Sequence, residues 1–154
     1  MSKSARFRAG TGALILNKNN EVLAFERTGQ TDAWQLPQGG IDLGERSIDG
    51  VYREVFEETG ITKDEIELIA EHPEWLVYEF PEHVKLGHYL GQAQKWYIFR
   101  LLSPPDSIDL AKAEHNEFQA WRWMSMHDLA EQIIYFKKNV YTKLEVFYNE
   151  VIAK

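Results

Sequence analysis

Three glutamates, Glu54, Glu57 and Glu58, have a spacing that can support chemistry. On a helix, residues three or four positions apart are surface neighbours, so Glu54 would lie beside both of the others. Three like charges repel one another, and Arg53 is the only basic residue near them on the helix. Clustered carboxylate oxygens suit Mg²⁺ or Mn²⁺. The alternative is an ordinary solvated helix face, as most Glu-rich faces are.

The helix that would carry these glutamates is predicted from Ser47 to Thr59, with Ser47 as its N-cap and Gly60 just beyond its end. Six side chains fall on one arc of roughly 140°: Ile48, Val51, Tyr52, Val55, Phe56 and Thr59. The three glutamates fall on another arc, roughly 100° wide. One face can therefore be buried while the other presents carboxylates.

The rest of the chain supplies strands and two more helices. Apolar residues on either side of a polar cluster at 17–20 predict a β-hairpin of residues 12–16 and 22–25. A short extended piece at 33–40 runs into a loop, and further strands are predicted at 67–70, 75–80, 95–102 and 117–123, with a loop at 81–91. A short helix opens at 125–128, and a long one is predicted over 133–152. The expected fold class is α/β (α+β), with a sheet packed between helices.

Composition indicates one domain over residues 1–154, with 44% hydrophobic residues to form its core. The chain has no cysteine, which excludes disulfides and thiolate metal sites. The sequence has no apolar run of about 18 residues and no apolar leader, so neither membrane contact nor secretion is expected. The expected location is cytoplasmic. A net charge of −7 argues against a protein that coats long nucleic acids, but not against an enzyme that holds one polyphosphate end through metal ions.

Residues 39–61, GGIDLGERSIDGVYREVFEETGI, carry a spaced signature over nine positions: Gly39, Glu45, Arg53, Glu54, Val55, Glu57, Glu58, Gly60 and Ile61. On these residues the chain is identified as a member of the Nudix hydrolase family. The resemblance implies the Nudix fold, a mixed β-sheet sandwiched between α-helices. It also implies that the loop and the helix together form a metal and diphosphate site.

The resemblance implies a role for each matched residue. Glu54, Glu57 and Glu58 would bind Mg²⁺ or Mn²⁺, with more than one ion when substrate is present, and a main-chain carbonyl near Gly39 would add a ligand. Glu45 and Arg53 would form a supporting pair that orients the loop and the helix. The expected reaction is attack of a metal-activated water on phosphorus. A binding module that has lost this chemistry is a separate hypothesis, opposed by the presence of every signature glutamate.

The flanking segments TGQTDAWQLPQGG, GQAQKWYIF, EFQAWRWMS and YFKKNVY extend the resemblance to two related branches of the family. These are the bacterial RNA pyrophosphohydrolases and the asymmetrical dinucleoside tetraphosphate hydrolases. The first implies removal of pyrophosphate from 5′-triphosphorylated RNA, which primes mRNA for decay. The alternative is hydrolysis of a dinucleoside polyphosphate such as Ap4A, or of a (d)NTP, at the same site. A homodimer is expected from the resemblance alone.

Four further residues match functional positions of these two branches, and the resemblance implies a role for each. Glu117 matches a glutamate that serves as a further metal ligand or base; otherwise it is a surface residue of an edge strand. Arg8, Phe136 and Lys137 match positions that hold the first bases and phosphates of RNA, through stacking and charge. The alternatives are an ordinary core side chain for Phe136 and solvated cations for the other two.

Three further candidate residues each have a functional and a structural interpretation. Arg27 and Lys95 would contact phosphate, or else form structural ion pairs. Tyr78 would stack on a base, or else lie in the core. The loop at 81–91 is short and contains Lys85 as its one fixed cation, and no basic tail follows; both features favour a smaller substrate. The five histidines show no pattern and are assigned to structure or surface.

Overall fold

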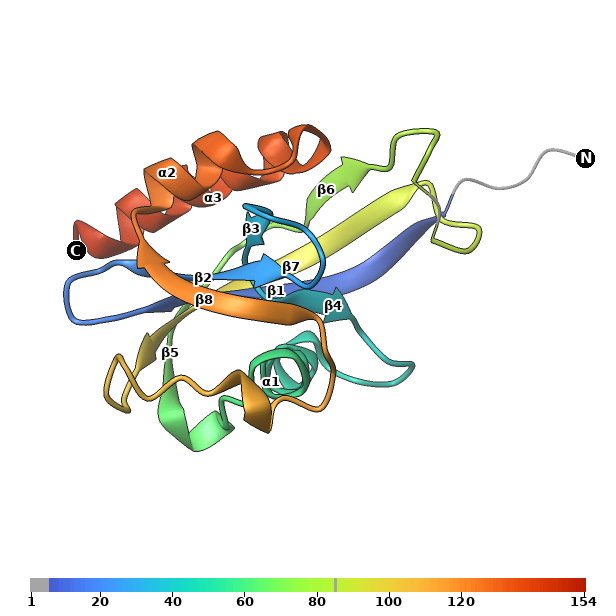
Figure 1. The fold of residues 1–154 in the computed structure, drawn as a ribbon. Helices are drawn as coiled ribbons and strands as arrows, with labels where there is room; N and C mark the ends of the chain where they lie inside the picture. Colours follow the sequence, from blue (N-terminus) through green and yellow to red (C-terminus); the bar gives the residue numbers. More distant parts are fainter. Residues whose placement is uncertain (1–5, 85) are drawn as a thin grey trace, which may run out of the picture.

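The computed structural model describes residues 6–84 and 86–154, and its centre is one mixed β-sheet (Figure 1). Residues 1–5 and Lys85, on which the predictions about a leader and a loop cation partly rest, lie outside the described residues. Within the described part the strands are β1 (Phe7–Leu16), β2 (Val22–Arg27), β3 (Trp34–Gln35), β4 (Gln38–Gly40), β5 (Ile66–Glu71), β6 (Leu76–Glu79), β7 (Gly91–Leu101) and β8 (Phe118–Met124).

The long strands β1 and β7 form the middle of the sheet and run parallel to each other. The main order is β3-β2-β1-β7-β5, while β4 pairs with β1, β6 with β7 and β8 with β2. All pairs other than β1–β7 are antiparallel. The predicted hairpin at the start of the chain is present, because Leu16 faces Val22 across an antiparallel turn.

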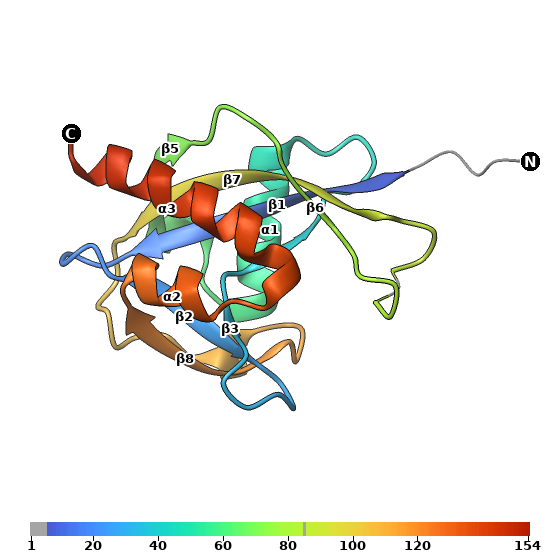
Figure 2. The same ribbon diagram turned by 90° about the horizontal axis from the view of Figure 1, so that it is seen from above.

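Helices cover both faces of the sheet (Figures 1 and 2). Helix α1 (Ser47–Thr59) packs on one face, and α2 (Met126–Gln132) and α3 (Lys138–Ile152) pack on the other. Side chains alternate along β1, so Ala13 and Ile15 face α1 while Leu14 and Leu16 face the other helices. A strand buried on both faces needs an unbroken apolar sequence, which explains why 13–16 show no polar alternation. The predicted sheet between helices is confirmed.

One predicted helix cap and one predicted helix boundary are wrong. The residue that caps α1 is Arg46, in an extended conformation and without a side-chain cap hydrogen bond. Ser47 lies one position inside the helix, and its hydroxyl instead shares a hydrogen bond of 2.5 Å with the hydroxyl of Tyr97. At the other end of α1 the prediction is correct, since Gly60 adopts the left-handed φ of 79° that glycine favours.

The predicted helix over 133–152 is wrong in its first five residues. Ile133 and Ile134 are extended, with ψ of 148° and 138°, and a 3-10 turn, η3 (Tyr135–Lys137), precedes α3. Two successive β-branched side chains favour the extended backbone, and Ile133 is buried in the core. As a result Phe136 and Lys137 lie on a turn at the start of α3, not within a helix.

Short 3-10 turns complete the chain at η1 (Lys63–Glu65) and η2 (Leu110–Lys112). The second turn packs on the end of α1, because a Cβ added at Gly60 would lie 2.6 Å from the Cβ of Lys112. Among the described residues, no helix is long and apolar enough to cross a membrane.

Candidate active site

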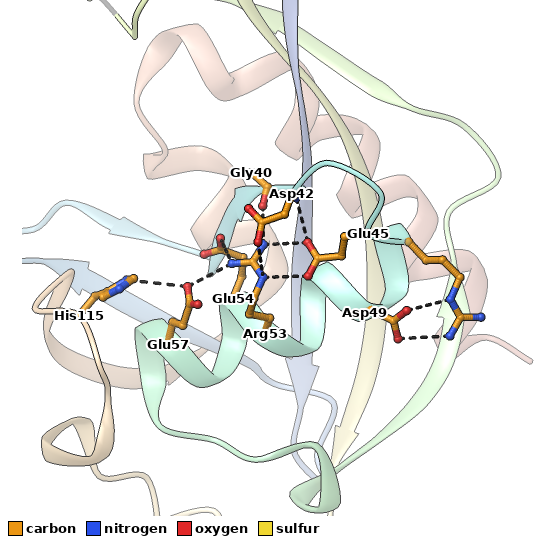
Figure 3. A network of polar contacts seen from close by, with 9 residues as sticks. Gly40, Asp42, Glu45, Asp49, Arg53, Glu54, Glu57 and His115 are labelled. Atoms are coloured by element: carbon orange, nitrogen blue, oxygen red, sulfur yellow. Dashed lines mark hydrogen bonds and ion pairs between the residues drawn. The ribbon is translucent and has the colours of Figure 1, made fainter.

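Arg53 is the centre of a dense polar network at the loop before α1 (Figure 3). Its Nε and Nη2 atoms donate to the two carboxylate oxygens of Glu45, each at 2.9 Å, and Nη2 also donates to the Gly40 carbonyl at 2.8 Å. Its Nη1 atom donates to Glu54 at 2.9 Å and to Glu57 at 3.2 Å. The hydrogen bonds with Arg53 lower the pKa of Glu45, and those with Glu45 raise the pKa of Arg53. One guanidinium thus joins the loop, β4 and the helix.

Gly39 and Gly40 let α1 and β1 approach β4 closely. Gly39 pairs with Thr11 of β1 in the sheet, and any Cβ at Gly39 would overlap the carboxylate of Glu54. A Cβ at Gly40 would overlap the guanidinium of Arg8, which lies on the opposite face. The two glycines therefore allow a carboxylate and a guanidinium to touch the same strand from its two sides.

Glu58 is the most deeply placed of the three helix glutamates. It is 4% exposed, and its Oε1 atom is buried without a hydrogen-bond partner. Burial raises the pKa of Glu58 well above its usual range, and the nearby charges of Glu54 and Glu117 raise it further. A buried carboxylate without a counter-charge is costly, which is the situation that a bound cation relieves.

The arrangement fits a divalent cation in three respects. The donors are carboxylate oxygens, which are the ligands that Mg²⁺ and Mn²⁺ prefer. The Glu58 Oε1 atom has no other partner, and the lack of a side chain at Gly39 lets the Glu54 carboxylate lie directly against β4. Within 6–84 and 86–154, no three acidic or histidine side chains are gathered closely enough to hold an ion, and Arg53 bonds to both Glu54 and Glu57. Ion binding would therefore require Glu57 to turn away from Arg53.

A second group of predicted residues lies together on the α3 face of the sheet. The rings of Tyr78 and Phe136 have centroids 6.0 Å apart, and the Nζ atom of Lys137 lies 5.8 Å from the Tyr78 centroid. Tyr78 is 5% exposed, and its hydroxyl accepts a hydrogen bond of 2.6 Å from the Gln92 amide. Burial raises the pKa of Tyr78 to about 12. Tyr78 is thus a core residue and a wall of this pocket at once.

Lys137 links this pocket to the carboxylates. Burial lowers its pKa to about 8, and the charge of Arg27 lowers it, while Glu117 and Glu58 act in the opposite direction. These electrostatic effects indicate that the side chains of Lys137, Arg27, Glu117 and Glu58 lie near one another, where the aromatic group around Tyr78 meets the carboxylates.

Lys95 lies apart from the pocket. Its neighbours Gln94 and Trp96 face α3, so alternation along β7 places Lys95 on the α1 face. It pairs with Thr11 on the side opposite Gly39, which separates the two backbones by about 10 Å across two strand spacings. The predicted phosphate contact of Lys95 would therefore come from the α1 side.

Sequence reasoning missed several polar residues of the site. Gln94 donates a hydrogen bond of 2.5 Å to Gln38, and both glutamines line the pocket beside Tyr78, while Gln92 donates to the Tyr78 hydroxyl. Gln92 and Gln94 occupy alternate positions of β7 and so lie on one face of the sheet, but glutamines at this spacing do not by themselves mark a site. His115 was also missed, and its Nδ1 atom lies 3.9 Å from a carboxylate oxygen of Glu57.

Three features agree with the family identified from the sequence: the glycines of β4, the glutamates of α1, and the Arg53–Glu45 pair, here called the Arg53 clasp. A profile of the NUDIX domain family matches residues 6–144. The chain belongs to the Nudix family, and the predicted family is confirmed. Members of this family typically use a divalent metal ion.

The proteins that resemble this chain include one of similar sequence and two of similar structure. The RNA pyrophosphohydrolase of Francisella tularensis subsp. mediasiatica (strain FSC147) is 37% identical over 156 residues, covering 99% of this chain and 100% of that protein. The structure of the E. coli dihydroneopterin triphosphate pyrophosphohydrolase is similar with a TM-score of 0.73 and 19% identity, covering 99% and 100% of the two chains. A C. elegans Ap4A hydrolase in a binary complex is similar with a TM-score of 0.66 and 23% identity, covering 93% and 98%. At such identities these two structures support the fold alone.

Proposed function

We propose that the protein is an RNA 5′-pyrophosphohydrolase that removes pyrophosphate from 5′-triphosphorylated RNA and thereby prepares mRNA for decay. The observation that carries the proposal is the junction at Lys137, where a pocket with aromatic walls meets the glutamate cluster. A base held beside Tyr78 and Phe136 would bring its 5′-phosphates toward the carboxylates. The full-length similarity to an RNA pyrophosphohydrolase supports this choice of substrate. A cytoplasmic location, a single domain over 1–154 and a homodimer belong to the same proposal.

In this proposal Glu54, Glu57, Glu58 and Glu117 would hold Mg²⁺ or Mn²⁺, together with a carbonyl near Gly39. Divalent ions at such a site supply activation of water and neutralisation of charge on phosphate oxygens. Arg53 and Glu45 act indirectly by holding the loop against the helix. The cations Arg8, Arg27, Lys95 and Lys137 would contact phosphates or a base edge.

In this proposal, residues of the pocket would position the base of the substrate. Phe136 would provide a flat apolar surface for a base, with the buried Tyr78 packed beside it, and the amides of Gln38, Gln92 and Gln94 would exchange their present hydrogen bonds for bonds to the base edge. The same pocket suits one base of Ap4A or of a (d)NTP, so small nucleotides are the alternative substrates.

A competition assay tests the proposed substrate. Triphosphorylated RNA of four nucleotides, diadenosine tetraphosphate and dGTP are mixed at near-physiological Mg²⁺, and relative kcat/KM is measured. We expect RNA to have the highest value, because only RNA presents a triphosphate and further nucleotides together. If either small nucleotide has the higher kcat/KM, the RNA assignment is wrong and the nucleotide hydrolase is the better description.

Lys137→Ala tests the junction between pocket and carboxylates. We expect kcat/KM for RNA to fall by about tenfold or more, on the scale of one charged hydrogen bond, while turnover of dGTP changes less. Lys143→Ala, which removes an exposed lysine from helix α3, is the matched control. An equal loss on both substrates would contradict a role for Lys137 in recognising RNA.

A further inference from the structure

Four aromatic rings form a continuous series from the wall of the pocket to the molecular surface. Phe80 meets Tyr78 edge-on at a centroid distance of 5.7 Å, and Tyr78 lies 6.0 Å from Phe136. Phe136 in turn meets Tyr135 at 5.5 Å with an interplanar angle of 87°. The series runs from the partly buried Phe80 through the buried Tyr78 and ends at Tyr135, which is 67% exposed.

The exposure of Tyr135 follows from the turn that carries it. Side chains project about 120° apart in a 3-10 turn, so neighbours point in different directions. In η3, Phe136 packs against the core around Tyr78 while Tyr135 projects outward. Ile134, just before it, is also exposed. A single exposed aromatic ring is common on proteins, but this one touches a ring of the substrate pocket.

Cations accompany the exposed ring. Lys137 and Lys138 lie two and three positions after Tyr135, and Lys137 points its ammonium group toward the Tyr78 ring. Lys138 lies 3.7 Å from Glu131 and donates to the Ala130 carbonyl at 2.6 Å, so this pair is locally neutral and Lys137 is the cation that lies against the aromatic series. Aromatic faces with adjacent cations are the surface that single-stranded nucleic acids bind, through base stacking and phosphate contacts.

We propose that Tyr135 is a stacking platform for a base of single-stranded RNA that lies beyond the nucleotide held in the pocket. The inference rests on the proposed function and deepens it, because it assigns a second subsite to the same enzyme. A free nucleoside triphosphate has no further base to place on Tyr135. The platform would therefore help the enzyme favour an RNA end over a small nucleotide.

Steady-state kinetics of Tyr135→Ala test this subsite with triphosphorylated RNA of one to four nucleotides. For the wild-type protein, KM should fall when a chain becomes long enough to reach Tyr135. In Tyr135→Ala this gain should disappear, with KM for the four-nucleotide RNA raised about five- to tenfold, at the lower end of the range for base–aromatic stacking. Tyr135→Trp keeps an aromatic face and should keep the gain. Values of kcat/KM for dGTP should be the same in all variants.

A fluorescence measurement locates the base. 2-Aminopurine is placed in turn at the second, third and fourth positions of the RNA, and its quenching on binding is compared between wild type and Tyr135→Ala. One position should be quenched by the wild type and not by the variant. Trp75→Ala removes another exposed ring, 47% exposed, near the far end of α3 and should leave KM and quenching unchanged.

The two proposals can fail separately. If the wild-type protein does not hydrolyse triphosphorylated RNA, the proposed function is wrong. If it does, but Tyr135→Ala retains the length-dependent gain and the same quenching, only the stacking platform is wrong. An equal rise of KM for dGTP would also overturn it, because Tyr135 would then act merely by supporting Phe136.

Discussion

Glu58→Gln is expected to lower kcat by about 100-fold or more, on the scale seen when one electrostatic contact to a transition state is removed. The amide has nearly the same shape as the carboxylate but supplies no negative charge to a bound cation. Glu58 is buried and its Oε1 atom has no hydrogen-bond partner, so no other side chain replaces it readily. Turnover of triphosphorylated RNA at saturating Mg²⁺ measures the effect. Glu57→Gln should behave in the same direction.

Stability separates loss of chemistry from loss of folding in this variant. Burial and neighbouring carboxylates raise the pKa of Glu58, which means that its charged form is disfavoured in the folded protein. Removing that charge should not lower the Tm measured without divalent ions, even though activity is lost. Glu150→Gln, on the exposed part of α3, is the control and should change neither quantity. A lower metal-free Tm for Glu58→Gln would mean that the activity loss has a structural origin.

Arg53→Lys is expected to lower activity by about 10- to 100-fold, the usual effect of removing a residue that orients metal ligands. Lysine keeps the charge but lacks the planar fork that binds both oxygens of Glu45 and the Gly40 carbonyl. Loss of hydrogen bonds to charged groups should also lower the free energy of unfolding by about 1.5–3 kcal/mol. Activity assays and urea unfolding measure the two effects.

Arg46→Lys provides the matched control for Arg53→Lys. Arg46 precedes the same helix and pairs with Asp49, but this pair lies in solvent and holds no other element. Exposed ion pairs contribute little to stability, so neither activity nor the urea midpoint should change. If both arginine variants lose activity to a similar degree, the particular role of the Arg53 clasp would be contradicted.

The part of the site that could be predicted from sequence is the part built by local signals. The apolar arc and the glycine at position 60 define α1, and its bounds agree with the prediction from Ser47 to Thr59. The contact between Glu45 and Arg53, implied by the family resemblance, is present in the structure. These groups are near in sequence, so helix geometry and a short loop bring them together. Their catalytic roles remain predictions.

The parts that could not be predicted depend on pairing between distant segments. Gln38 and Gln94 meet only because β4 and β7 both flank β1, and glutamine alone has no distinctive spacing. His115 reaches Glu57 because its main-chain amide donates to the Glu57 carbonyl from a segment 58 positions later. The break before α3 was hidden by an apolar period that continued through it. In each case tertiary contacts decided the outcome.

The parallel pairing of β1 with β7 has a consequence for how the enzyme is made. The partner of Phe7, Gly91, is synthesised 84 positions later, so the central contact of the sheet is strongly non-local. Such topologies fold slowly compared with helical proteins, because a long loop must close before the pairing stabilises it. The glutamate helix emerges from the ribosome well before β7 does. A nascent chain therefore carries all three helix glutamates while the β7 side of the substrate pocket has yet to be synthesised.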